Sequence, residues 1–317
     1  MKRIAVLTRD CAGVNAAIRA VVRTAAGRGV GALGILKGYE GLIDGLTVPL
    51  TRRSVSGIIN LGGTILKSAR CERFLSADWR GRAAETVRRL GIDGLIVMGG
   101  NGSLHGAHLL HVEAGVPVVG IPATIDNDIN GVDLALGADT AVNVALDALD
   151  KIRDTATSLE RIFVVEVMGR DCGYIALQVA LAGGCEEVLI PERDYDPDRI
   201  CADIKAGNAE GKVSWIIIVA EGKARAEDVA RAITDRTGFE TRVAVLGHIQ
   251  RGGRPTALDR IMAARLGRAA VDALLEGCTD CCVRLRNGVL DLWPLDKAVL
   301  LKTTPVESDY RLLKLLS

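Results

Sequence analysis

Short apolar stretches rich in valine, isoleucine and leucine alternate along this chain with longer stretches of helical periodicity, and this alternation constrains the fold more than any other feature. Buried strands are predicted at 4–8, 95–98, 116–121, 162–167, 215–220 and 243–246. Helices are predicted at 15–27, 83–90, 103–113, 138–152, 174–182 and 226–237. Strand–helix alternation of this kind produces a mostly parallel sheet with helices on both faces. The expected fold class is therefore α/β.

The length of 317 residues is sufficient for two domains. No low-complexity linker separates them, so the boundary has to come from the strand–helix pattern. We place it near Gly137. Residues 138–250 then form a second α/β unit, and the chain returns to the first unit from Arg251 onward.

The composition excludes several classes of partner. The formal net charge is +1 and aromatic residues are only 3%, which gives no reason to expect nucleic acid or a membrane surface. The first apolar stretch is too short for a signal peptide, and no window approaches the roughly 18 apolar residues of a membrane span. We therefore expect a cytoplasmic protein.

Cysteine and histidine give weak signals for a metal. Cys278 and Cys281 have CxxC spacing, but no second pair or histidine follows, so the eight cysteines are interpreted as scattered reduced thiols, with a metal or redox site as the alternative. The three residues His105, His108 and His111 drift around a helix by about 60° per step, which favours surface or interface positions over a metal cluster.

Two carboxylates, Asp126 and Asp128, lie two residues apart just after the predicted strand at 116–121. In open parallel sheets the carboxyl ends of strands are where ligands bind. One carboxylate can accept a proton while the other holds a metal or a positive group. The alternative is a turn that only caps the strand, because Asp and Asn are common in such turns.

A glycine-rich turn, Gly99-Gly100-Asn101-Gly102-Ser103, follows a strand and opens a helix. Glycines let the backbone approach a phosphate, and a helix N-terminus offers N–H groups and the positive end of its dipole. We expect Ser103 to cap this helix and Gly115 to close it. The alternative is a turn used only for packing.

Several arginines lie at predicted strand ends or beside glycine-rich loops, where bidentate guanidinium groups suit phosphate oxygens. They are Arg70, Arg161, Arg170, Arg242 and Arg251. The alternative for any one of them is a solvated surface charge. Glu221 also ends a predicted strand and is suited to accept hydrogen bonds from sugar hydroxyls.

These segments together resemble the bacterial ATP-dependent 6-phosphofructokinase family (phosphofructokinase A), nearly from end to end. The resemblance is carried by 14–19, 62–64, 68–70, 124–128, 165–170 and 246–253. It implies two Rossmann-like three-layer domains with mostly parallel sheets, the active site in the cleft between them, and a homotetramer. It also implies the glycolytic phosphorylation of fructose 6-phosphate, with ATP as co-substrate and Mg²⁺ as cofactor. The larger, nucleotide-side domain would be 1–137 plus about 251–300, and the smaller, sugar-phosphate domain would be 138–250 plus the C-terminal tail.

The resemblance implies a role for each matching residue. Asp126 is the general base that removes the proton from the sugar 1-hydroxyl, and the other catalytic residues are Thr124, Asp128 and Arg170. The sugar-phosphate contacts are Thr124, Ile125, Asp126, Arg161, Met168, Gly169, Arg170, Glu221, Arg242, His248, Ile249, Gln250 and Arg251, with Arg161 and Arg242 serving an adjacent subunit. The nucleotide contacts are Arg70, Cys71, Gly100, Asn101, Gly102 and Ser103, and the metal ligands are Asn101 and Asp128.

An effector site for ADP or phosphoenolpyruvate between subunits is also implied by the resemblance. Its residues are Arg19, Arg23, Arg52, Arg153, Gly184, Glu186 and Lys212. One cation of that pocket is replaced by Glu210, which reverses a charge and would retune anion binding.

Two departures from the family lie on the nucleotide side. In the family the first loop reads Thr-Ser-Gly-Gly-Asp-Ala-Pro-Gly. In this chain the loop is Thr8–Gly13, which is two residues shorter and lacks the paired glycines, and Arg9 is a substitute source of charge. Asn101 replaces an aspartate beside Mg²⁺. These departures leave open a sugar-phosphate or nucleotide sensor. A pyrophosphate-dependent kinase is a third interpretation, disfavoured because the small residues Gly102 and Ala123 leave room for a nucleotide.

Overall fold

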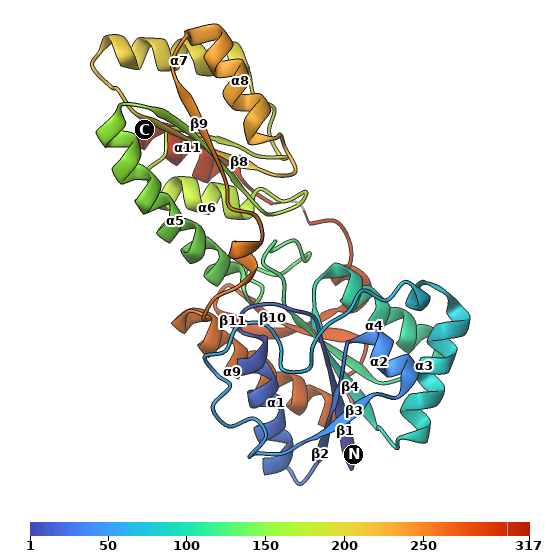
Figure 1. Ribbon diagram of the computed structural model, residues 1–317. Helices are drawn as coiled ribbons and strands as arrows, with labels where there is room; N and C mark the ends of the chain where they lie inside the picture. The colour runs from blue at the N-terminus through green and yellow to red at the C-terminus, as the bar shows by residue number, and fades with distance from the viewer. Residues whose placement is uncertain (303) are drawn as a thin grey trace. The chain divides into compact units, whose positions relative to one another are not determined.

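The computed structural model describes residues 1–302 and 304–317, which form two compact units. Unit 1 contains Met1–Thr140 and Arg251–Lys302. Unit 2 contains Ala141–Gln250 and the C-terminal residues to Ser317. Each unit has a sheet of mostly parallel strands with helices packed on it, so the predicted α/β class is confirmed (Figure 1). Which unit serves the nucleotide and which the sugar phosphate stays a prediction.

The described part of unit 1 forms a seven-stranded sheet in the order β11-β10-β5-β4-β1-β2-β3. Its strands are β1 (Arg3–Thr8), β2 (Gly31–Ile35), β3 (Thr47–Leu50), β4 (Gly94–Gly99), β5 (Val118–Pro122), β10 (Cys281–Arg286) and β11 (Val289–Pro294). The two edge strands β3 and β11 are antiparallel to their neighbours, and the other neighbouring pairs are parallel. The central strands β4 and β5 are apolar, and β1 is apolar between Arg3 and Thr8, because helices cover both faces of the sheet.

The helices of unit 1 include segments from both ends of the chain. They are α1 (Val14–Gly27), α2 (Tyr39–Asp44), η1 (Arg73–Leu75), α3 (Ala77–Arg89), α4 (Asn101–Ala114), α9 (Ala257–Leu275) and α10 (Leu295–Ala298). Figure 1 shows α9, coloured orange, beside the blue α1. On the other face, α3 and α4 pack on β1 and β4 around a core that includes Val87, Leu95 and Leu104.

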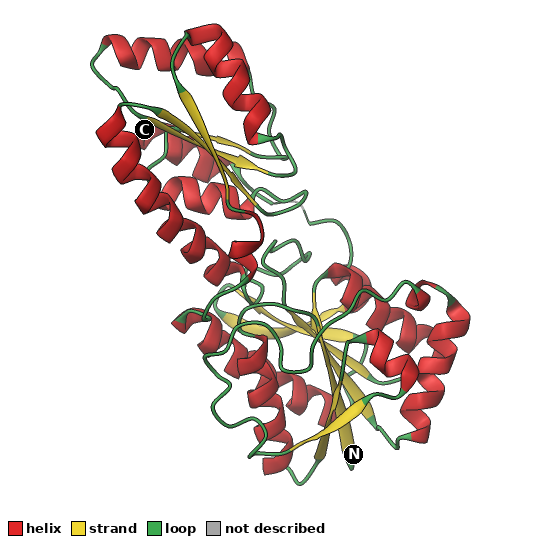
Figure 2. Cartoon of the chain, viewed as in Figure 1, coloured by secondary structure: helices red, strands yellow, loops and turns green. Residues whose placement is uncertain are grey.

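Unit 2 has a four-stranded parallel sheet in the order β7-β8-β6-β9 within its described residues. Its strands are β6 (Ile162–Val167), β7 (Glu187–Leu189), β8 (Trp215–Ala220) and β9 (Thr241–Val245). Its helical segments are α6 (Tyr174–Ala182), α7 (Pro197–Ala209), α8 (Ala226–Thr237), η2 (Gly247–Arg251, which ends in unit 1) and α11 (Glu307–Leu316). The helix α5 (Ala138–Leu159) begins in unit 1 and continues into unit 2 (Figure 2).

All six predicted strands and all six predicted helices are present, with shifted ends at several of them. Five strands were missed, and each had a local reason. For example, β2 carries two glycines, and β10 alternates with charged residues beyond its cysteines. All eight cysteines, each within the described residues, are free. No helix in the described residues is long and apolar enough to cross a membrane.

Candidate active site

The carboxyl ends of β1, β4 and β5 are neighbours in unit 1 because these strands pair in the order β5-β4-β1. The sequence order of the strands reverses between β1 and β4, since β2 and β3 lie beyond β1 and β5 lies beyond β4. In doubly wound α/β folds such a reversal opens a crevice where ligands bind. The turn after β5 and the start of α4 therefore lie at the expected place for a site.

The turn after β5 holds Asp126 by backbone geometry. The Asp126 N–H donates to the Thr124 hydroxyl over 3.2 Å. The next residue, Asn127, adopts a left-handed backbone with φ 52, and its side chain donates to the Asp133 carbonyl and accepts from the Ala135 N–H. Asn tolerates this conformation better than most residues. Asn127 was not predicted as a residue that fixes this turn, although an asparagine between two aspartates was a usable signal.

Asn101 and Asp128 form a direct pair at the same edge of the sheet. The Asn101 Nδ2 donates to Asp128 Oδ2 over 2.9 Å and to the Asp128 carbonyl over 3.1 Å. Asn101 Oδ1 and Asp128 Oδ1 are both buried, and neither has a hydrogen-bond partner among the described residues. Buried oxygens without a partner are costly unless a ligand completes them. Amide and carboxylate oxygens are ligands for Mg²⁺, which also takes substrate phosphates and water, so this pair fits the metal.

The helix α4 begins two residues earlier than the sequence analysis predicted. Gly100 is its N-cap residue, no side chain caps it, and Ser103 lies inside the helix, so the predicted Ser103 cap is wrong. The helix starts at this point because the chain must turn beside the segment after β5. Gly100 suits that position, since a Cβ on it would lie 3.3 Å from Thr124 Cβ. An N-terminus without a side-chain cap presents backbone N–H groups to an anion. A Cβ on Gly102 would meet no atom within 4 Å, so space is open at this position.

The other residues predicted to contact the nucleotide, Arg70 and Cys71, lie in the segment that leads to η1. Arg70 is exposed and Cys71 is partly buried. Burial, and secondly the neighbouring Glu40 carboxylate, raise the pKa of the Cys71 thiol to about 11. Cys71 is therefore a neutral thiol near pH 7 and contributes no charge to anion binding.

Three strand ends in unit 2 are tied together by two side chains. The Glu221 carboxylate, after β8, accepts from the N–H groups of Gly169 and Arg170 over 3.2 and 3.0 Å. The Gln250 side chain, in η2, accepts from the Met168 N–H over 2.8 Å and has no exposed surface. These bonds fix the turn after β6, so the structure gives Glu221 and Gln250 a positioning role that the sequence analysis did not predict.

The same turn carries unusual backbone geometry. Gly169 has φ 146 and Arg170 has φ 51. A Cβ on Gly222 would lie 1.8 Å from the Arg170 carbonyl oxygen, so only glycine fits after Glu221. A non-glycine residue with positive φ is uncommon and is retained where surrounding contacts hold it. The close approach of Gly222 and the two hydrogen bonds from backbone N–H groups to Glu221 hold the turn at Arg170.

Arg161 and Arg242 are brought together by a carboxylate that the sequence analysis missed. Arg161 Nε donates to Glu240 Oε2 over 2.9 Å, and Arg242 pairs with Glu240 Oε1. Parallel pairing of β6 with β9 places Ile162 opposite Thr241, so Arg161 lies beside Glu240, two residues before Arg242. Of the remaining sugar-phosphate candidates, His248 and Ile249 are exposed in η2. Ile125 and the Arg251 Nε are buried, and that Nε has no hydrogen-bond partner in the described chain.

The candidate effector residues fall into two groups, one in each unit. Arg19 and Arg23 are on α1, and Arg52 lies beside Gly27 at the end of that helix, all in unit 1. In unit 2, Arg153 donates to the carbonyls of Gly183 and Gly184, the latter over 3.0 Å. The second pair there is Lys212 and Glu186, at 3.1 Å. The replacement residue Glu210 ends α7.

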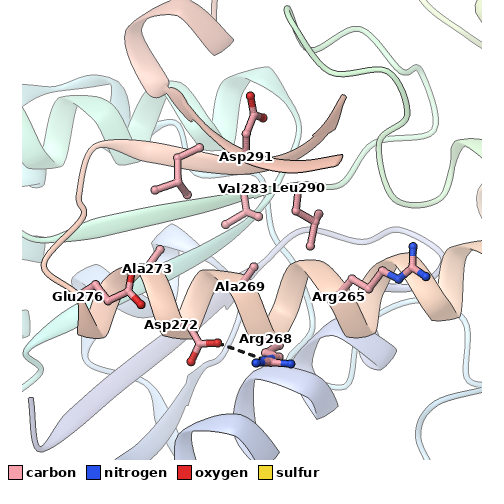
Figure 3. A pocket seen from close by; sticks show the side chains of 10 residues that line it. Arg265, Arg268, Ala269, Asp272, Ala273, Glu276, Val283, Leu290 and Asp291 are labelled. Carbon is pink, nitrogen blue, oxygen red and sulfur yellow. Dashed lines mark hydrogen bonds and ion pairs between the residues drawn. The ribbon is translucent and has the colours of Figure 1, made fainter. Parts of the chain in front are cut away.

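A surface cavity of about 380 Å³ lies in unit 1 between α9 and the β10–β11 hairpin (Figure 3). It contains none of the predicted site residues. Its wall has an apolar part that includes Val283 and Leu290, and Arg268 is paired with Asp272 at 3.2 Å. Since three acidic side chains (Asp272, Glu276 and Asp291) line it beside two arginines, this cavity does not suit a phosphate-rich substrate.

The site groups instead form two sets at strand carboxyl ends, one with a carboxylate pair and an uncapped helix N-terminus, the other with arginines. Phosphoryl transfer needs a base, positive charge on the moving phosphoryl oxygens and an aligned acceptor. These two sets contain the kinds of group that a phosphotransferase uses.

Comparison with known proteins is consistent with this class. Residues 3–274 match the phosphofructokinase family profile. The chain is 49% identical to an ATP-dependent 6-phosphofructokinase of Thermotoga neapolitana and 47% identical to one of Clostridium botulinum, with 100% of both chains covered in each case. It also resembles the solved phosphofructokinase of Pichia pastoris, with a TM-score of 0.90 and 35% identity over 94% of this chain and 37% of that longer one. The chain belongs to the phosphofructokinase family.

Proposed function

We propose that this protein is an ATP-dependent 6-phosphofructokinase, which transfers a phosphoryl group from ATP to fructose 6-phosphate and yields fructose 1,6-bisphosphate. The observation that carries the proposal is the pair of segments after β4 and β5. Asn101, the first residue of the uncapped helix α4, pairs with Asp128, and Asp126 lies two residues before Asp128, in a chain 49% identical over its full length to a curated enzyme of this activity. This is a glycolytic reaction, and it uses Mg²⁺.

Each residue set has a defined task in this reaction. Asp126 accepts the proton from the sugar 1-hydroxyl as that oxygen attacks the γ-phosphorus, and the bond from the γ-phosphorus to the bridging oxygen breaks, so that ADP leaves. The N–H groups at the start of α4 hold donor phosphate oxygens, and Arg70 contributes charge on the same side. Asn101 and Asp128 would hold Mg²⁺, which neutralises charge on the phosphoryl oxygens. Arg170, His248 and Arg251 bind the sugar phosphate, and the Glu221 carboxylate holds the turn that carries Arg170.

A coupled assay with purified protein tests the proposal. Fructose 6-phosphate, ATP and Mg²⁺ should give fructose 1,6-bisphosphate at about 1–10³ turnovers per second. Pyrophosphate in place of ATP should give little product, because Gly102 leaves open space at the nucleotide side. Binding of the sugar phosphate without turnover with either donor would overturn the enzyme proposal in favour of a sensor. None of the described contacts favours that alternative.

A homotetramer is part of the proposal. β9 is an edge strand with exposed Val243 and Val245, and Ile249 follows it with 59% of its surface exposed. Exposed apolar edges are suited to pairing with another chain. Arg242 on β9, and Arg161, which shares Glu240 with it, would then serve the neighbouring subunit.

The assembly prediction is tested at that edge. Val245→Glu should shift the protein to smaller species in analytical ultracentrifugation and weaken fructose 6-phosphate binding. The matched control is Val289→Glu, on the exposed edge strand β11 of unit 1, which should leave both unchanged. A fully active wild-type monomer would contradict the prediction.

Regulation and location complete the proposal. An anionic effector, ADP or phosphoenolpyruvate, would use the arginines of α1 together with Arg153 and Lys212. The Lys212–Glu186 pair at 3.1 Å supports such a site, because an anionic effector could replace the Glu186 carboxylate as the partner of Lys212. A cytoplasmic location is supported by eight free cysteines within the described chain, since reducing compartments keep thiols unpaired.

A further inference from the structure

Arg9 lies at the point in unit 1 where the strand order reverses. It is the first residue after β1, and Gly99 is the last residue of the neighbouring strand β4. The Arg9 N–H donates to the Met98 carbonyl over 2.9 Å, which extends the β1–β4 contact by one residue. The side chain of Arg9 therefore starts inside the crevice region where doubly wound folds bind ligands.

The Arg9 side chain connects the two nucleotide-side segments. A Cβ on Gly99 would lie 3.2 Å from Arg9 Cγ, so the aliphatic stem of Arg9 runs across Gly99. Further out, Arg9 Nη1 donates to the Ala69 carbonyl over 2.7 Å in a partly buried contact. Ala69 directly precedes Arg70. The guanidinium is thus held between the start of α4 and the Arg70 segment.

We propose that Arg9 is a donor-binding residue whose guanidinium contacts the phosphate chain of ATP. This inference rests on the proposed function and identifies how the short Thr8–Gly13 loop can serve it. Arg9 follows β1 beside the strand that leads into α4, and its guanidinium donates to the residue before Arg70. A guanidinium binds phosphate oxygens through paired N–H groups, and the N-terminus of α4 favours the same anion. Gly99 leaves room for both Ser103 and the stem, since a Cβ there would lie 2.6 Å from Ser103 Cβ and 3.2 Å from Arg9 Cγ.

The competing explanation is that Arg9 only ties the loop to Ala69. Two substitutions separate the explanations. Arg9→Gln removes the charge and keeps an amide donor, whereas Arg9→Lys keeps the charge without the planar fork. Arg3→Ala is the matched control, because Arg3 starts β1, at its other end, and also donates Nη1 to a carbonyl, that of Leu90, over 2.6 Å.

Calorimetric titration with the non-hydrolysable analogue adenylyl imidodiphosphate and Mg²⁺ is the test, with AMP as the ligand that lacks the outer phosphates. Arg9→Gln should weaken analogue binding by about 10–100-fold, the effect of one charged hydrogen bond, and change AMP binding little. Arg9→Lys should fall between wild type and Arg9→Gln. Arg3→Ala should bind like wild type.

Several results would overturn the inference: analogue binding unchanged in Arg9→Gln, equal losses for the analogue and AMP, or no analogue binding by the wild type. The proposed function fails differently. A wild type that binds the analogue with Arg9-dependent affinity and yet transfers no phosphoryl group would refute the activity and leave the Arg9 contact established.

Discussion

Replacing Asp126 by asparagine is expected to lower kcat by about 10²–10⁴-fold, the usual contribution of a general base. The carboxylate lies in the turn after β5 and is 3% exposed, so water does not replace it easily as a proton acceptor. Asparagine keeps the shape of the side chain and removes its basicity. Steady-state kinetics should show the loss in kcat, while calorimetry should show fructose 6-phosphate affinity within a few-fold of wild type.

The matched control is Asp133→Asn, on the same loop. Asp133 is exposed and its carboxylate accepts from the Asn287 N–H over 2.6 Å, away from the proposed chemistry. This variant should keep wild-type kcat. Equal losses in both variants would mean that the loop is merely sensitive to charge removal, and an unchanged kcat in Asp126→Asn would remove Asp126 as the base.

The second large effect is expected at the Asn101–Asp128 pair. Asp128→Asn should reduce kcat/KM by about 10²–10³-fold, because a bound metal supplies several kcal/mol of charge stabilisation and Asp128 is the charged member of the pair. The Mg²⁺ concentration at half-maximal rate should rise at the same time. Titration of Mg²⁺ at fixed ATP measures both changes.

A swap variant tests whether the two side chains act together. Asn101→Asp combined with Asp128→Asn keeps one amide and one carboxylate across the 2.9 Å contact and should recover part of the lost activity. Asn101→Asp alone places two carboxylates side by side, so the free energy of unfolding should fall without Mg²⁺ and recover when it is added. If the swap were no better than Asp128→Asn, the residues would not form a common metal site.

The strands and the site segments that follow them were predicted from local pattern. β6 and β8 have the predicted bounds: β8 is apolar and buried throughout, and β6 is apolar except for Glu166, as expected for inner strands of a parallel sheet. The missed elements lacked that signal. α7 begins at a proline, and its acidic N-cap Asp196 was visible only as one more surface charge.

Within the candidate site, side chains were predicted by type and place but not by partner. Glu221 was interpreted as a sugar contact, and the structure shows that its carboxylate accepts from the Gly169 and Arg170 amides. Glu240 was missed altogether, although it lies two residues before Arg242, a spacing that puts both on one side of an extended chain. The partners could not be inferred because they depend on strand order.

The sequence by itself determined the α/β class and the position of Asp126 and Asp128 after a buried strand, because the burial and the length of a strand follow from the run of consecutive apolar residues. Only the tertiary structure decided which distant groups meet. Asn101 pairs with Asp128 across 27 residues, Arg9 reaches Ala69 across 60, and Met168 bonds Gln250 across 82. Those contacts follow from which strands lie side by side and from hydrogen bonds of a few ångströms, and neither is set by local pattern.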